Sequence, residues 1–96
     1  MLALRNAWLI ARGKTPIAEA SMAKISATEL RSELASAAME LLGRAGGLSA
    51  ASGARAPLAG RAEWTFRLSP IFRFGGGTNE VMRDIVAAAG LGLPGR

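Results

Sequence analysis

The residues with the clearest potential for chemistry form one continuous stretch near the end of the chain. Three glycines, Gly75–Gly77, run directly into Thr78, Asn79 and Glu80. Threonine is a favourable helix N-cap, so a helix is expected to begin after a loop of unusual backbone freedom. The backbone of such a loop can press against a ligand, and the first amides of a helix have no partner within it. Glycines followed by a helix N-cap therefore predict a ligand-binding site where the loop meets the helix.

The composition excludes most side-chain catalysis. The 96-residue chain contains no cysteine, histidine or tyrosine. It therefore cannot form a Cys/His zinc site, a cysteine nucleophile or a serine–histidine triad. Among its acidic residues, only Glu80 and Asp84 lie near the glycines. We expect no catalytic residue and no metal site, and because no disulfide can form, nothing argues for secretion and a cytoplasmic location is expected.

The net charge of +5 raises the question of a nucleic-acid partner. The arginines are scattered without a run of like charge, whereas residues that read a nucleic-acid groove usually cluster on one element. We therefore expect no nucleic-acid partner. The apolar runs are far shorter than the ~20 residues that cross a bilayer, so no membrane span is predicted.

Glycine and proline divide the first half into two helical segments. Residues 2–12 have helical periodicity, and Gly13 ends them. A long helix over about 16–42 follows, without internal glycine, and stops at Gly43. A long helix with small residues on its apolar stripe is typical of an antiparallel bundle. The stripe consists of Ala23, Ala27, Leu30, Leu34, Ala38 and Leu41.

The second half is more interrupted. Residues 44–60 are rich in glycine, serine and alanine and predict a flexible connector, with a loop that crosses over the bundle as the alternative. A short helix is expected over about 61–68, ended by Ser69–Pro70.

The final helix is expected over about 79–89, followed by an aperiodic tail over 91–96. Val81, Ile85 and Ala88 would form its inner face. Together these elements predict an all-α fold. The arrangement is a partial antiparallel helical bundle that forms a single domain.

Two segments resemble the acyl-CoA dehydrogenase family. Ala20–Glu29 reads ASMAKISATE and is similar to the opening of a long bundle helix in that family, which ends here in the AMELLG of Ala38–Gly43. The second segment is the GGTNEVMRDIVA of Gly76–Ala87. The resemblance implies a C-terminal helical-bundle fragment of an FAD-dependent enzyme that oxidises the Cα–Cβ bond of an acyl-CoA thioester. Such a role in lipid catabolism implies other dehydrogenase subunits as partners.

The resemblance also implies a share of an FAD site that other chains complete. Thr78, Asn79 and Glu80 match residues that contact the cofactor. Gly77 matches a glycine beside the thioester of the acyl-CoA substrate.

Several positions depart from the family pattern. Gly76 stands where many members carry a catalytic glutamate, and members with GGTNE take their base from an earlier helix that this chain lacks. Glu40 and Gly43 match the end of the long helix that, in the family, contacts the FAD of a neighbouring subunit. Glu40 replaces the usual glutamine, however, and Arg44 replaces a common glycine.

Because the base and the remaining flavin domain are missing, these residues alone cannot remove the α-proton or transfer a hydride. Enzymatic activity of the isolated chain is therefore left open. The alternative is a non-catalytic helical module that stabilises a partner dehydrogenase.

Overall fold

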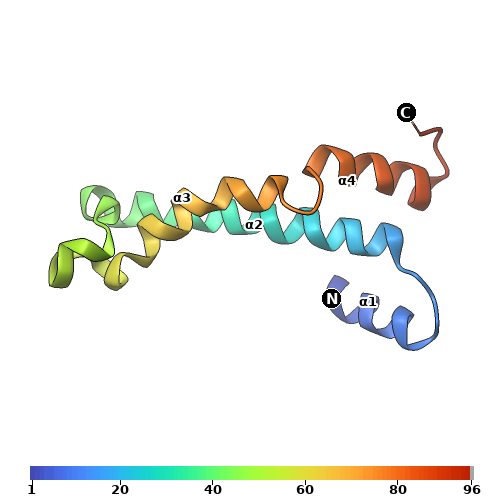
Figure 1. The fold of residues 1–96 in the computed structure, drawn as a ribbon, viewed down its shortest axis with the longest axis horizontal. Coiled ribbons are helices and arrows are strands. Elements are labelled where there is room, and N and C mark those ends of the chain that lie inside the picture. Colours follow the sequence, from blue (N-terminus) through green and yellow to red (C-terminus); the bar gives the residue numbers. More distant parts are fainter. Residues whose placement is uncertain (96) are drawn as a thin grey trace. The chain divides into compact units, whose positions relative to one another are not determined.

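The computed structural model describes residues 1–95 and is built from helices (Figure 1). The four main helices are α1 (Leu2–Ala11), α2 (Ile17–Leu42), α3 (Arg61–Phe74) and α4 (Asn79–Ile85). No strand occurs in the part of the chain that the structure describes, which confirms the predicted all-α class. The chain forms two compact units, one of Met1–Ala27 with the segment from Phe74 onward, and one of Thr28–Arg73.

Helix α1 ends as the sequence predicts. Gly13 has a φ of +72°, a left-handed conformation that glycine adopts without a steric penalty. The amide of Gly13 donates to the carbonyl of Ile10 at 2.9 Å, and the amide of Lys14 donates to that of Leu9 at 3.0 Å. These two bonds form a Schellman motif, which satisfies the last carbonyls of the helix and reverses the chain.

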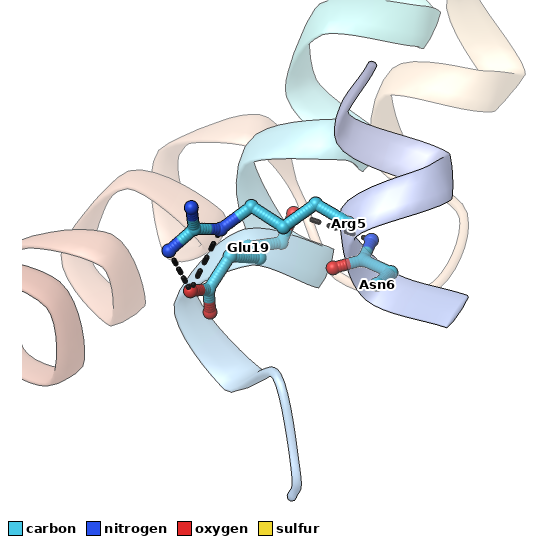
Figure 2. A network of polar contacts seen from close by, with 3 residues as sticks. All are labelled: Arg5, Asn6 and Glu19. Carbon is cyan, nitrogen blue, oxygen red and sulfur yellow. Dashed lines mark hydrogen bonds and ion pairs between the residues drawn. The ribbon is translucent and has the colours of Figure 1, made fainter. Parts of the chain in front are cut away.

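A polar cluster joins α1 to the first turn of α2 (Figure 2). The guanidinium of Arg5 donates to Glu19 Oε1 from Nη2 at 3.2 Å and from Nε at 3.4 Å. Beside it, Asn6 Nδ2 donates to the backbone carbonyl of Glu19 at 3.5 Å. The cluster thus links α1 to the first turn of α2 within this unit.

The carboxylate of Glu19 gives this cluster a pH dependence. The pKa of Glu19 lies below its ordinary value because the carboxylate accepts a hydrogen bond from its own backbone amide and another from Arg5. A lowered pKa in the folded state adds stability above the unfolded pKa of about 4.3, and this stability is lost as the pH falls through the folded value.

We therefore expect Glu19→Gln to lower the free energy of unfolding near neutral pH and to have no effect in acid, below the folded pKa of Glu19. The change is small because the pair lies at the surface. Urea unfolding across this pH range measures it, with the exposed Glu33→Gln as the control. An equal loss at every pH would show that the carboxylate charge does not act here.

Helix α3 is longer than predicted, because Ser69–Pro70 does not end it. Pro70 lacks an amide hydrogen, so the carbonyl of Phe66 loses its usual helical donor. Instead, the hydroxyl of Ser69 donates to this carbonyl at 2.8 Å. The replacement bond lets the helix continue to Phe74, and the predicted end at about residue 68 is wrong.

Three 3₁₀ turns occupy the region between α2 and α3: Gly43–Gly47, Ala50–Arg55 and Pro57–Gly60. Gly60 has a φ of +75°, and a Cβ at this position would lie 2.3 Å from the backbone nitrogen of Ala50. The turns therefore contact each other through backbone atoms, where a side chain has no room. The flexibility of residues 44–60 in solution stays a prediction.

The core within the chain is small. The buried hydrophobic residues among those described are Leu9, Ala35, Ala56 and Ala62. The larger side chains on the apolar stripe of α2 are exposed: Leu30 by 55%, Leu34 by 61% and Leu41 by 88%. The opposite side of α2 is better covered. Its Ser21 and Ala35 are buried, and Arg31 stacks on Phe72 of α3 with its Cζ 4.0 Å from the ring centroid.

Helix α4 continues through a π-helical turn over Val86–Gly90, close to the predicted end of the last helix. Gly92, with a φ of +68°, ends it. The predicted inner position of Val81 is wrong, since 49% of this residue is exposed. The tail was predicted over 91–96, of which Arg96 lies outside the described residues. None of the helices in residues 1–95 is both long and apolar enough to cross a membrane.

Candidate functional site

The candidate site is the glycine corner, which we define as residues 75–80. Its helical side forms as predicted, with Thr78 as the N-cap of α4. Thr78 has an extended backbone, and its Oγ1 accepts a hydrogen bond from the amide of Val81 at 3.3 Å. This bond satisfies one of the amides in the first helical turn and fixes the direction in which α4 leaves the loop.

The glycines of the corner have different surroundings. Gly76 has a φ of +71°, and a Cβ there would meet no atom within 4 Å, so space beside its backbone is open. Gly77 has a φ of +100°, and a Cβ there would lie 2.5 Å from Cε of Met82. The Met82 methyl is the end of a flexible side chain, so it is the positive φ of Gly77 that favours glycine there, whereas Gly76 presents bare backbone to the surface.

Asn79 is enclosed by the protein. It has a relative exposure of 0%, and its Oδ1 accepts a hydrogen bond of 2.6 Å from the ammonium of Lys24. The same ammonium donates to the carbonyl of Gly77 at 2.8 Å. Lys24 therefore ties α2 to both the loop and the first residue of α4.

The remaining predicted site residues lie at the surface. Glu80 is exposed and Thr78 is half-buried, so both can be reached from outside the chain. Glu40 and Gly43, predicted to contact the cofactor of a neighbouring subunit, are exposed near the end of α2 and belong to the other compact unit. The structure thus brings Gly77–Glu80 together in one corner, and Glu40 with Gly43 at the end of one helix.

The corner exposes backbone and carboxylate groups that can form hydrogen bonds. These groups are the backbone around Gly76, which has open space beside it, and the carboxylate of Glu80. The chain has no cysteine, histidine or tyrosine. Within residues 1–95 no cluster of acidic side chains is suited to a metal ion.

Lys24 was not identified as a site residue from the sequence. It lies on α2, far along the chain from Gly77, and nothing in the local pattern indicates which groups its ammonium would meet. A shallow groove on the same compact unit was also missed. It has a volume of about 290 Å³ and is lined by α1, α2 and the C-terminal part of the chain, with Met22, Ile25 and Arg83 among its residues.

Comparison with known protein families matches nearly the whole chain. The family model described as "Acyl-CoA dehydrogenase, C-terminal domain" matches residues 1–91. The chain belongs to the acyl-CoA dehydrogenase family. The suspected relationship is thereby confirmed, and the match covers both α2 and the glycine corner of this dehydrogenase domain.

Two relatives come from Mycobacterium tuberculosis. The chain is 49% identical to acyl-CoA dehydrogenase FadE26 over 82 residues, which is 85% of this chain and 20% of FadE26. It is also similar to a chain in the crystal structure of the ChsE4–ChsE5 complex, with a TM-score of 0.83 and 43% identity over 99% of this chain and 25% of that one. The sequence therefore spans about a fifth to a quarter of these proteins.

Proposed function

We propose that this chain is the C-terminal helical part of an FAD-dependent acyl-CoA dehydrogenase. In this proposal it contributes flavin contacts and subunit packing. Other polypeptide chains complete the FAD site, and this chain is inactive alone. The observation that carries the proposal is the accessible glycine corner on a helical domain that buries few of its large apolar side chains.

The surface residues of the corner fit the edge of a flavin. The open space beside Gly76 admits a flat ligand close to the backbone, where a side chain would obstruct it. The carboxylate of Glu80 suits a ligand hydroxyl or ring N–H, whereas it would repel a pyrophosphate. The side chain of Asn79 is enclosed, so it does not fit a direct contact with the flavin. In our proposal it supports the corner from inside the protein.

When bound, FAD would supply the hydride acceptor for oxidation of the acyl thioester. The residues of this chain bind and orient in our proposal. Thr78 holds α4 at the corner, Glu80 accepts a hydrogen bond from the cofactor, and Gly77 lies beside the thioester. The contacts of Glu40 and Gly43 with the FAD of a neighbouring subunit belong to the same proposal and rest on their exposed positions.

Substitution at the corner tests these contacts. The protein for the experiment is a complex of this chain with FadE26 from which the matching segment has been removed. Glu80→Ala should weaken FAD retention by about tenfold, the effect of one hydrogen bond to a charged group. Asp84→Ala, which removes an exposed acid further along α4, should leave it unchanged. Unchanged FAD affinity in Glu80→Ala, measured by flavin fluorescence, would refute the contact.

The enclosure of Asn79 favours one alternative, in which the chain stabilises a partner dehydrogenase without touching its cofactor. In that case Glu80→Ala would alter neither FAD retention nor association. An acyl-CoA ligand and a cytoplasmic location also remain proposals, which substrate-dependent flavin bleaching in the complex and cell fractionation would test.

A further inference from the structure

The ammonium of Lys24 contacts both the loop and the helix of the glycine corner. Its Nζ donates to the carbonyl of Gly77 at 2.8 Å and to Oδ1 of Asn79 at 2.6 Å. Both bonds join partly buried groups separated by more than half of the chain. Hydrogen bonds from a charged donor are shorter and stronger than neutral ones, and they gain strength away from water.

The loop that Lys24 holds would be mobile without a tether. Gly76 and Gly77 both have positive φ angles, +71° and +100°. Glycine loses more conformational freedom on folding than any other residue, so consecutive glycines need favourable contacts to stay in one conformation. The cap bond of Thr78 lies on the helical side of the corner and does not involve the carbonyl of Gly77.

We propose that Lys24 is a positioning residue that locks the glycine corner in its binding conformation. Its ammonium holds Gly77 in the loop and Asn79 at the start of α4. Thr78 lies between these two residues and Glu80 follows them, so both are kept accessible from outside the chain. The lock itself follows from the contacts of this chain. Only its consequence for the cofactor rests on the proposed function.

The lock is distinguishable from a general contribution to folding. The same compact unit contains α1 and its Schellman motif at Gly13, whose two hydrogen bonds are formed by backbone groups of residues 9–14. A residue that only stabilised the unit as a whole would change the rate of amide exchange in α1 and in the corner by the same factor. A residue that locks the corner changes residues 75–81 alone.

Amide hydrogen exchange of the full chain, followed residue by residue, provides the test. Lys24→Met keeps the apolar stem and removes the charge. It should accelerate exchange at residues 75–81 about tenfold and leave the amides of Gly13 and Lys14 unchanged. Lys14→Met, which removes an exposed lysine from the turn after α1, should alter neither region.

Substitution of the acceptor provides the matching evidence. Asn79→Asp retains an oxygen for the ammonium and should preserve slow exchange, whereas Asn79→Leu removes one of the two bonds and should accelerate exchange less than Lys24→Met does. The double variant Lys24→Met/Asn79→Leu should exchange little faster than Lys24→Met alone, because Lys24→Met already removes the bond that Asn79→Leu removes. Acceleration of α1 and the corner by the same factor, or no acceleration at all, would overturn the lock.

The cofactor consequence has a separate readout. In the complex with truncated FadE26, Lys24→Met should weaken FAD binding although Lys24 does not face the ligand. Faster exchange at residues 75–81 without weaker FAD binding would leave the lock intact and contradict the proposed flavin contact.

Discussion

Gly60→Ala is expected to destabilise the Thr28–Arg73 unit by about 2–5 kcal/mol, which is sufficient to unfold the 3₁₀ turns of a small domain. Two effects add. A side chain at a φ of +75° is strained in any surroundings. The new Cβ would also lie 2.3 Å from the nitrogen of Ala50 and 2.7 Å from the carbonyl carbon of Ser49, and these backbone atoms cannot rotate away.

Two other glycines separate these effects. Gly53→Ala introduces a side chain at a φ of +60° and a ψ of −137°, where L residues are rare, with no atom within 4 Å, so it should show the conformational strain alone, about 1–3 kcal/mol. Gly47→Ala meets no neighbour and has no positive φ, so it should change stability by less than about 0.5 kcal/mol. Urea unfolding of the three variants measures the series. Equal stability of Gly60→Ala and Gly53→Ala would contradict the close backbone contact.

Leu34→Glu is expected to weaken association with the rest of a dehydrogenase at least 100-fold while the chain itself remains as stable as before. Leu34 is 61% exposed, so a glutamate there stays hydrated in the isolated chain. If other polypeptide covers this face of α2, the same carboxylate must be buried without a partner, which costs several kcal/mol.

Ser36→Glu is the matched control, since Ser36 lies off the apolar stripe on the same helix. It introduces the same charge and should weaken association by less than about tenfold. Isothermal titration calorimetry of each variant with truncated FadE26 measures and compares the affinities. Similar affinities for Leu34→Glu and the unchanged chain would exclude this stripe as the contact surface.

The helices of this protein could be predicted from the sequence because their ends are marked by local chemistry. Gly13, the Thr78 cap and Gly43 each act on the backbone within a few residues, and the structure places helix boundaries beside all three. The end of α3 could not be predicted in this way. The hydroxyl of Ser69 rescues the carbonyl that Pro70 leaves unsatisfied, and this bond depends on a rotamer that sequence does not reveal.

The candidate site was only partly predictable for a different reason. Residues 77–80 are adjacent in sequence, so their shared corner follows from the N-cap. The role of Lys24 depends on a contact across the chain, which periodicity does not indicate. The enclosure of Asn79 follows from the same contact. The inner face of α4 was mispredicted at Val81 because helical spacing identifies an apolar face without saying whether this chain or another covers it.

The central claim is that this chain completes a flavin site built mostly from other polypeptide. The most direct measurement is the FAD content of truncated FadE26 purified with and without this chain, from the absorbance of the bound flavin. Our account predicts about one FAD per complex and little or no FAD on either part alone. Colourless complexes, or full FAD content in truncated FadE26 without this chain, would contradict it.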